Sequence, residues 1–352
     1  MMNKQENISA SSAVSLPIRR IDDPREKLEA IALARRSING KLGETLLLDE
    51  EAKIRQKVQA LPSGILSLDE AIGIGGYPKG RLIEMFGAES SGKTTVAIQA
   101  VAKSQKSGGF VAYIDVENAL DPDYAKALGV DISLMELAQP DSGEEAFYVL
   151  EELVKTGAFD LIVLDSVASL TPQVEIDGVE KPGEQARMMS CNLRKLVSMV
   201  NKTKTVVIFI NQTRSNVNQV FGPAETTPGG KALKFYASVR IEVKTAETIK
   251  RIDGEKEFDV GKRVILHTVK NKVSAPFKKA LTSNIWGLGF TPAIDIVTVA
   301  NRLSLINRYG DWYSFDGQKI GRGLFEVQEY LDSHPDILDE LEFRARERLG
   351  FL

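Results

Sequence analysis

The sequence predicts a protein of the α/β class, with a mostly parallel sheet flanked by helices. Two observations lead to this prediction. Short, almost uniformly apolar runs alternate with helical segments along the middle of the chain, as in parallel strands buried on both faces. One of these runs, 82–86, is followed directly by a phosphate-loop motif and a helical segment. Because ligands of such sheets lie beyond the carboxyl ends of the strands, we expect a phosphate-binding site at this junction.

The composition is that of a globular protein and excludes several functions. The 352 residues are 43% hydrophobic and 26% charged, with a net charge of −3, so a DNA-binding surface must be a local patch. The two histidines, His267 and His334, are too few for a histidine-based metal site or triad. The single cysteine, Cys191, excludes an internal disulfide and is expected to be a buried helical residue. No apolar run approaches the roughly 20 residues of a membrane span, so we expect a cytoplasmic protein without a membrane partner.

The chain is expected to begin with a flexible extension, residues 1–22, followed by an N-terminal helical segment, 23–60. Asp23 is a good N-cap, and Glu26 completes a capping box. The helix is expected to end at Gly40. Three residues give it one apolar face: Leu28, Ile31 and Ile38.

The core is expected over residues 61–288. Its parallel strands are predicted at 82–86, 110–115, 134–138, 161–166 and 205–212. Its helices are predicted around 65–72 and at 93–106, 122–128, 143–156 and 184–200. Three later runs follow one another with only loops between them, which predicts antiparallel strands added at an edge: 237–243, 264–269 and 280–286.

A change of texture at about Gly289 predicts a small α/β C-terminal domain, residues 289–352. We expect short helices at 294–303 and 323–331, joined by loops. Trp312 and Tyr313 are expected to be core aromatics of this domain.

The phosphate-loop motif matches G-x-x-x-x-G-K-[ST] at every fixed position. Its glycines let successive backbone N–H groups face inward, and the following helix directs its positive dipole end to the same point. A plain Gly/Ser turn would explain the glycines but not the Lys-Thr pair, so we expect a bound nucleoside triphosphate. Lys93 would reach the terminal phosphates, and the Thr94 hydroxyl would bind Mg²⁺. The expected nucleotide-binding residues of the loop are Gly87, Ala88, Glu89, Ser90, Ser91, Gly92, Lys93, Thr94 and Thr95.

Three further strand ends carry polar residues where the nucleotide would lie. Glu117 could act as the general base for the attacking water, although an isolated Glu here more often supports the next helix. Asp165 ends an apolar strand and is expected to hold Mg²⁺; a surface-turn Asp is the weaker alternative. Asn211 and Gln212 end the next strand, where an amide could bond the γ-phosphate and sense its loss, although an amide at a strand end is often only a cap.

Two loops, 176–185 and 213–231, are expected on the same face of the sheet. The second is long and rich in Gly, Pro and Thr, with Arg214 and Phe221 within it. A cation, an exposed aromatic ring and backbone donors suit single-stranded nucleic acid. Taken alone, each loop is more often a linker.

The sequence resembles the bacterial RecA recombinases over about residues 65–321. The resemblance rests on the strings GAESSGKTT (87–95), YIDVENALDPDYAKALGVD (113–131), LIVLDSVASLTP (161–172), ARMMSCNLRKL (186–196), FINQTR (209–214), ETTPGGKALKFYASVR (225–240) and VKNKVSAPFK (269–278). It implies a RecA-like P-loop NTPase core, with ATP and Mg²⁺ as cofactors. It also implies assembly into a filament on single-stranded DNA, strand exchange with double-stranded DNA, and stimulation of an SOS repressor's self-cleavage.

The resemblance assigns roles to individual residues. Lys93, Thr94 and Asp165 resemble the phosphate and Mg²⁺ residues, Glu117 the catalytic base, and Gln212 the γ-phosphate sensor. The resemblance also implies that Asp121 and Tyr124 contact adenine.

Other roles implied by the resemblance concern DNA and the neighbouring subunit. Lys270 and Lys272 would reach the ATP of a neighbouring protomer, Phe235 would pack at the interface, and the helix in 23–60 would pack on the next subunit. The DNA-binding residues would be Arg187, Arg214, Phe221, Gly229 and Gly230.

The sequence departs from the family pattern in three places. The loop 176–184 is about three residues shorter than expected, which bears on DNA contact there. Residues 40–49 resemble an insertion, and the last residues lack the acidic tail often found in the family, which predicts a weaker dependence on Mg²⁺.

Two other functions remain open on the residues. A ring helicase or branch-migration ATPase would share the phosphate loop and Asp165 without needing the strings at 225–240 and 269–278. A DNA-coating filament locked by ATP would not need Glu117. A kinase is disfavoured because we find no second substrate site.

Overall fold

The computed structural model describes residues 23–42, 58–179, 181–215, 225–253 and 256–352. The chain divides into two compact units, residues 1–57 and 58–352. The predicted flexible extension, 1–22, and the segment 43–57, which contains most of the predicted insertion, lie outside the described residues.

The described part of the first unit is essentially the helix α1 (Pro24–Leu42). It begins where the sequence predicts, and the Asp23 carboxylate accepts the backbone N–H of Arg25 at 2.8 Å. The predicted end at Gly40 is wrong, because the helix continues to Leu42. A glycine inside a helix costs only about 1 kcal/mol relative to alanine, which is too little to stop a helix by itself.

The apolar face predicted for α1 is largely open to solvent. Leu28 is 69% and Ile31 52% exposed, and the neighbouring Leu33 is 44% exposed. Ile38 is half-buried. This amphipathic helix therefore presents an apolar stripe to its surroundings.

The second unit is built on one large sheet. In the described part of residues 58–352, its strands lie in the order β13-β12-β11-β10-β3-β7-β6-β4-β5. Strands β3, β7, β6, β4 and β5 pair in parallel, as predicted. The bounds are β3 (Leu82–Gly87), β4 (Val111–Asp115), β5 (Met135–Ala138), β6 (Leu161–Asp165), β7 (Val206–Gln212), β10 (Val239–Asp253), β11 (Lys256–Asn271), β12 (Lys279–Ile285) and β13 (Gly289–Phe290).

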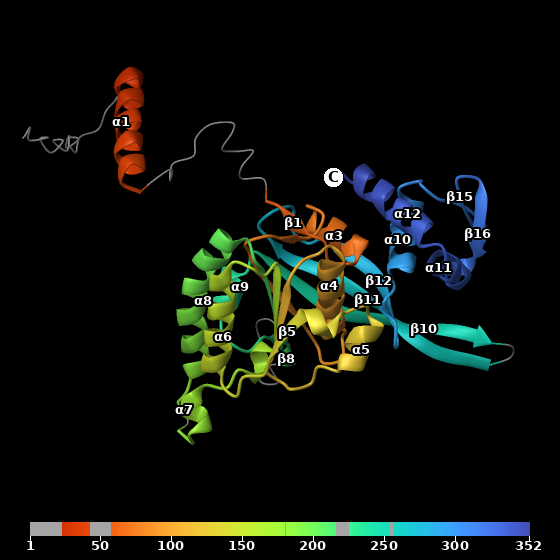
Figure 1. Ribbon diagram of the computed structural model, residues 1–352, viewed down its shortest axis with the longest axis horizontal. Helices are drawn as coiled ribbons and strands as arrows, with labels where there is room; N and C mark the ends of the chain where they lie inside the picture. Colours follow the sequence, from red (N-terminus) through yellow and green to blue (C-terminus); the bar gives the residue numbers. More distant parts are fainter. Residues whose placement is uncertain (1–22, 43–57, 180, 216–224, 254–255) are drawn as a thin grey trace, which may run out of the picture. The chain divides into compact units, whose positions relative to one another are not determined.

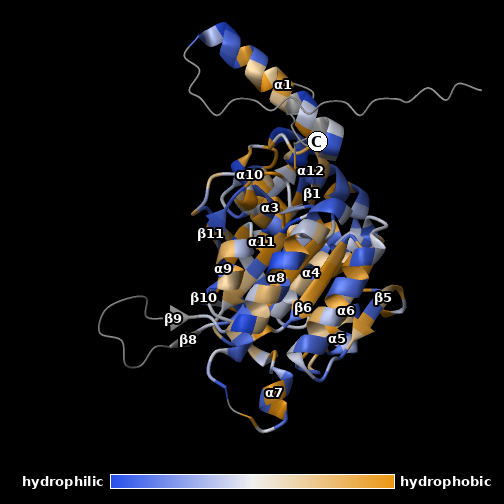
Figure 2. Cartoon of the chain, turned by 90° about the vertical axis from the view of Figure 1, so that its left-hand side faces the viewer, coloured by the Kyte–Doolittle hydropathy of each residue, from blue (hydrophilic) through white to orange (hydrophobic). Residues whose placement is uncertain are grey.

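Helices cover both faces of this sheet (Figure 1). One face packs against α3 (Leu66–Ile72), α4 (Lys93–Lys106) and α5 (Pro122–Ala127). The other packs against α6 (Gly143–Thr156), α8 (Glu184–Thr203) and α9 (Ala232–Tyr236). Figure 2 shows hydrophilic residues along α8 and hydrophobic residues in the strands behind it. The predicted α/β class with a mostly parallel sheet flanked by helices is confirmed.

The later strands differ in part from the prediction. β10 pairs with β3 in parallel, with Arg240 opposite Glu84, so it continues the parallel sheet instead of forming an antiparallel edge. The short helix α9 lies in the crossover that a parallel connection requires. β11 and β12 then add antiparallel to it, as predicted. The β10–β11 hairpin extends well beyond the other strands (Figure 1).

The C-terminal segment contains more regular structure than the sequence predicts. Helices α10 (Pro292–Arg302) and α11 (Gly323–Ser333) match the two predicted helices. Between them lies an antiparallel sheet of β14 (Asn307–Tyr309), β15 (Trp312–Phe315) and β16 (Gln318–Arg322), and a further helix, α12 (Pro335–Arg348), follows. These elements share a hydrophobic cluster of their own, to which Leu66 of α3 also contributes.

Two expectations about single side chains are wrong. Trp312 is 44% exposed, because side chains alternate along β15 and only Tyr313 and Phe315 face inward. Cys191 is exposed, because the buried stripe of α8 runs through Met188, Leu193 and other positions on the opposite face.

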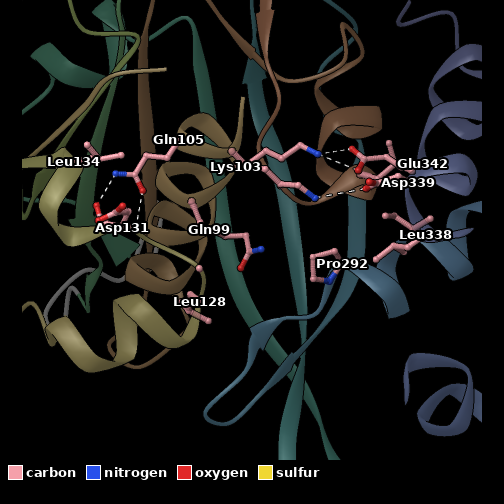
Figure 3. Close-up of a pocket in the computed structure, with 16 residues that line it drawn as sticks. Gln99, Lys103, Gln105, Leu128, Asp131, Leu134, Pro292, Leu338, Asp339 and Glu342 are labelled. Atoms are coloured by element: carbon pink, nitrogen blue, oxygen red, sulfur yellow. Dashed lines mark hydrogen bonds and ion pairs between the residues drawn. The ribbon is translucent and has the colours of Figure 1, made fainter. Parts of the chain in front are cut away.

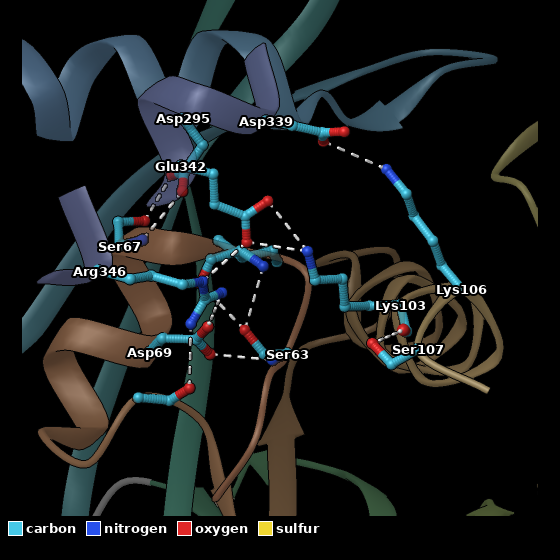
Figure 4. Close-up of polar contacts among 12 residues, drawn as sticks. Ser63, Ser67, Asp69, Lys103, Lys106, Ser107, Asp295, Asp339, Glu342 and Arg346 are labelled. Atoms are coloured by element: carbon cyan, nitrogen blue, oxygen red, sulfur yellow. Dashed lines mark hydrogen bonds and ion pairs between the residues drawn. The ribbon is translucent and has the colours of Figure 1, made fainter. Parts of the chain in front are cut away.

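A network of charged side chains joins α12 to the core (Figure 4). Glu342 accepts hydrogen bonds from Lys103 of α4 and from Arg346, each at 2.8 Å. Arg346 also donates to Asp69 of α3 at 2.8 Å. Burial raises the pKa of Asp69 to about 6, although Arg346 opposes this shift. A cavity of about 510 Å³ lies beside the network, between α4 and α12, and contains no predicted site residue (Figure 3).

The remaining described elements are short. They are β1 (Ala60–Leu61), β2 (Tyr77–Pro78), η1 (Ile132–Leu134), η2 (Val167–Ser169), α7 (Gln173–Ile176), β8 (Arg214–Ser215) and β9 (Glu225–Thr226). Among the described residues, no helix has both the length and the hydrophobicity needed to cross a membrane. In the same ranges, no group of three or more His, Cys, Asp and Glu side chains is arranged to hold a metal ion.

Candidate functional site

The phosphate loop connects β3 to α4 at the carboxyl end of the sheet, as predicted. Gly92 takes the left-handed conformation at the N-cap of α4, with φ 97°. A Cβ on Gly87 would lie 2.3 Å from the Val243 carbonyl oxygen, so only glycine fits there. The buried hydroxyl of Ser91 has no hydrogen-bond partner among the described residues. An unsatisfied donor and a helix N-terminus at one point suit an anionic ligand.

Lys93 lies within the loop. Its Nζ donates to the Ala88 carbonyl oxygen at 2.7 Å, so the side chain lies along the loop. Burial lowers the pKa of Lys93, whereas Asp165, Glu117 and Glu89 oppose this shift. An incoming phosphate would stabilise the charged form of this ammonium in the same way.

Thr94 and Asp165 are in contact at the carboxyl end of the sheet. The Thr94 hydroxyl donates to Asp165 Oδ2 at 2.8 Å, and the buried Tyr113 hydroxyl donates to the same oxygen at 2.8 Å. Burial raises the pKa of Asp165, and these two hydrogen bonds oppose the rise. One hydroxyl and one carboxylate fit Mg²⁺, which takes few protein oxygens and keeps water and phosphate ligands.

Glu117 and Gln212, predicted from separate strand ends, are in contact. Gln212 Nε2 donates to Glu117 Oε1 at 3.2 Å. The same oxygen accepts the hydroxyls of Ser166 at 2.5 Å and Ser169 at 3.0 Å. Glu117 therefore does not cap the helix that follows it, which was its alternative role. No motif in the sequence pointed to Ser169 as a residue of the site.

Asp121 takes that capping role instead. Its Oδ1 accepts the backbone N–H groups of Asp123 at 2.9 Å and Tyr124 at 3.1 Å, at the N-terminus of α5. Asp121 thereby fixes the start of the helix that carries Tyr124. Its predicted contact with adenine stays a prediction.

A cavity of about 370 Å³ opens beside the phosphate loop. Tyr124 lines it, and its hydroxyl lies 3.2 Å from Thr95 Oγ1. Asn284, Trp286 and Gly287, at the end of β12 and beyond it, also line this cavity. Sequence reasoning missed these three residues, because they are about 190 positions from the phosphate loop and match no motif.

Because Trp286 lines this cavity, we expect it to report nucleotide binding. We expect ATP to change its fluorescence, because a ligand in the cavity would alter the polarity around the ring. The measurement is a titration of the Trp312→Phe variant, which leaves Trp286 as the sole tryptophan. An unchanged signal while ATP binding is detected by another method would place the nucleotide away from this wall.

The described parts of the two predicted DNA-binding loops converge at the start of α8. Gly229 and Gly230 both have positive φ, 79° and 72°. Gly229 N–H donates to Gln185 Oε1 at 3.1 Å, and a Cβ on Gly230 would meet that of Ala186 at 2.9 Å. Gln185 also donates to the carbonyl oxygens of η2 and Leu170, so it links the second loop to the segment after Asp165.

The other predicted DNA-binding residues are more peripheral. Arg187 is exposed in the first turn of α8, with Nη1 3.3 Å from Glu184 Oε1. Arg214 lies in β8, which pairs with β9. Phe221 lies outside the described residues.

Lys270, Lys272 and Phe235 cluster together, and none of them lines the cavity beside the phosphate loop. Lys270 Nζ donates to the carbonyl oxygens of Lys234 at 2.6 Å and Phe235 at 2.9 Å, and Lys272 Nζ lies 3.4 Å from the latter. The Phe235 side chain is 69% exposed. Burial, Lys272 and Arg240 lower the pKa of Lys270 to about 8.

This lowered pKa predicts a fall in activity at alkaline pH. Above pH 8 Lys270 loses its proton and cannot neutralise a phosphate. We therefore expect kcat/KM for ATP hydrolysis to decline as pH rises through about 8. Lys270→Arg keeps its charge, so the decline should shift to higher pH. Identical profiles for the two proteins would assign the decline to another group.

The sheet, the phosphate loop and the residues around it define a class: an α/β protein of the phosphate-loop nucleotide-binding type. The RecA N-terminal domain family matches residues 29–291, and the RecA C-terminal domain family matches residues 294–350. A relative named "Protein RecA, plasmid", from Lactococcus lactis subsp. lactis, is 61% identical over 337 residues, which cover 96% of this chain and 98% of the relative.

Two streptococcal relatives, each named "Protein RecA", agree. The protein from Streptococcus gordonii is 46% identical over 100% of this chain and 91% of its own length. The protein from Streptococcus pyogenes serotype M1 is 48% identical over 93% of this chain and 87% of its own length. The chain therefore belongs to the RecA family of recombinases, which bind ATP and DNA.

Proposed function

We propose that this protein assembles on single-stranded DNA as an ATP-dependent filament and catalyses homologous pairing and strand exchange with double-stranded DNA. Binding of single strands would stimulate ATP hydrolysis. The main observation that supports this proposal is the contact between Glu117 and Gln212, because Gln212 lies at the start of the second predicted DNA loop. One hydrogen bond thus joins the proposed base to the proposed entrance of the DNA-binding segment.

The proposed roles follow from where each group lies. Lys93 and the loop N–H groups would hold the phosphates. Thr94 and Asp165 would hold Mg²⁺, which would supply positive charge against the phosphates. Glu117 orients and deprotonates the attacking water. Ser166 and Ser169 fix the carboxylate by hydrogen bonds to one of its oxygens. Gln212 leaves Glu117 for the γ-phosphate when ATP is bound.

Assembly completes the site. The phosphate-loop lysine of a protomer's own site is Lys93, and Lys270 and Lys272 lie beside the exposed Phe235 instead. We therefore assign these two lysines to the ATP of the neighbouring protomer. The exposed apolar stripe of α1 supports packing on the next subunit, which would make 23–60 a polymerisation segment. Head-to-tail contacts of this kind produce open filaments or closed rings.

The cellular setting belongs to the same proposal. The protein would act in the cytoplasm, in recombinational DNA repair and in SOS induction through repressor self-cleavage. The family and its relatives support recombination and repair. The repressor rests on the family resemblance alone, since no surface among the described residues identifies it as a partner.

The first test is ATP hydrolysis with and without single-stranded DNA at two salt concentrations. We expect strong stimulation by single strands that weakens with salt, because contacts with phosphates release counterions. DNA-independent hydrolysis would count against the proposal. Unwinding of a forked duplex without strand exchange would favour the helicase or branch-migration alternative.

A further inference from the structure

A stripe of polar side chains crosses four neighbouring strands of the sheet. β7, β3, β10 and β11 lie side by side, and each contributes one residue. The residues from β3, β10 and β11 lie level with the middle of β3, and the one from β7 lies opposite Phe86, nearer the phosphate loop. The residues are Asn211, Glu84, Arg240 and Lys270. Arg240 pairs with Glu84 across β10–β3 and with Lys270 across β10–β11.

Hydrogen bonds connect the first three members of this stripe. Asn211 Nδ2 donates to Glu84 Oε1 at 3.1 Å, and Arg240 Nε donates to Glu84 Oε2. Glu84 and Asn211 are completely buried, and the Arg240 side chain is 15% exposed. The Arg240 guanidinium also lies 4.5 Å from the centroid of the Phe86 ring.

Stability alone does not explain this arrangement. Removing an ion pair from water costs free energy that well-packed apolar residues would not, and replacing such pairs by apolar residues is often neutral or stabilising. The neighbours of Glu84 along β3, Ile83 and Met85, are apolar and fully buried. A charged pair in such a strand therefore indicates that these side chains must be held in fixed positions.

The two ends of the stripe reach different functional groups. At one end, Asn211 Oδ1 accepts the backbone N–H of Gln212 at 3.0 Å, and its Nδ2 donates to the Pro228 carbonyl oxygen at 3.3 Å. Asn211 thus holds both the entry and the exit of the second predicted DNA loop. At the other end, Arg240 lies beside Lys270, and the negative charge of Glu84 attracts the Lys270 ammonium group.

We propose that Asn211, Glu84 and Arg240 form a positioning network that couples a protomer's own nucleotide site to its second DNA loop and to the lysines that serve the neighbouring site. This inference rests on the proposed function. ATP that draws Gln212 away from Glu117 moves the residue adjacent to Asn211. The Glu84–Arg240 pair holds the Asn211 side chain in place. The movement of Gln212 therefore displaces the loop at Pro228 and Lys270, and is not lost in a local adjustment of the strand.

The test compares the gain in DNA affinity that ATP produces. The probe is a fluorescein-labelled oligothymidylate, and its dissociation constant is measured by anisotropy with and without a slowly hydrolysed ATP analogue. The main variant, Glu84→Gln with Arg240→Met, removes both charges together, so that neither is left buried alone. The control is Lys103→Met with Glu342→Gln, which removes a largely buried ion pair outside the stripe and leaves Arg346 paired with Asp69 (Figure 4).

We expect wild type and control to gain affinity on ATP binding within the roughly 5- to 150-fold range of coupled sites. The main variant should gain less than about twofold, with ATP affinity within about threefold of wild type by Trp286 fluorescence. Arg240→Lys keeps a cation against Glu84 and should restore part of the gain. It also serves as the variant of choice if the double replacement does not fold.

Three results are decisive. A full gain in the main variant would overturn the positioning role. A parallel loss of ATP affinity, DNA affinity and thermal stability would also overturn it, because that pattern belongs to a purely structural pair. Wild type without any gain would instead refute the proposed function, and the inference with it.

Discussion

Replacement of both Lys270 and Lys272 by alanine is expected to lower the single-strand-stimulated rate of ATP hydrolysis by about 10³-fold or more, the range seen when a cation supplied by a neighbour is lost. These lysines donate hydrogen bonds to carbonyl oxygens at the end of α9, and neither lines the cavity beside their own phosphate loop. Under the proposed function, their effect on hydrolysis would come from the next protomer. The measurement is steady-state hydrolysis with saturating single strands.

A matched control is Lys278→Ala with Lys279→Ala. Both residues are exposed lysines that follow closely in the chain and have no assigned role in the site. We expect the control to keep its activity, and ATP binding reported by Trp286 to survive in both variants. Undiminished hydrolysis in the Lys270/Lys272 variant would mean that the nucleotide site closes within one subunit.

Glu117→Gln is expected to lower the same rate by at least about 10²-fold, as is usual on loss of a general base. The glutamine oxygen can still accept the hydroxyls of Ser166 and Ser169, so the side chain should stay in place. ATP-dependent DNA binding should persist, because the phosphate loop and Mg²⁺ residues are intact. The control Asp123→Asn removes a nearby exposed carboxylate without a proposed role. Unchanged hydrolysis in Glu117→Gln would instead support the DNA-coating filament.

Mixing the two inactive variants tests the shared site directly. In a one-to-one mixture, about a quarter of head-to-tail interfaces would combine an intact Glu117 with intact lysines from the neighbour. Activity should therefore return in the mixture to a level far above that of either variant alone. No recovery would show that the residues do not act across an interface.

Much of this protein could be predicted because the information is local. The apolar runs, the capped start of α1 and the phosphate loop each occupy a few consecutive residues whose backbone preferences and burial pattern need no distant partner. The same is true of Glu117, Asp165 and Gln212, since a polar residue directly after a buried parallel strand must lie at the ligand edge of the sheet. Two errors have different causes: the propensity cost of Gly40 is too small to end a helix, and the alternation of side chains along β15 places Trp312 outward.

The sequence by itself determined the fold class, the family and the place of the phosphate loop between a buried strand and a helix. Only the tertiary structure decided that β10 enters the sheet beside β3 in parallel, and that Trp286 and Tyr124 line the same cavity. The tertiary structure also decided that Asn211, Glu84 and Arg240 meet under the second loop. The physical reason is that strand order and long-range side-chain contacts depend on which surfaces pack together. Residues 84, 211 and 240 become neighbours only when the sheet brings three separate strands side by side.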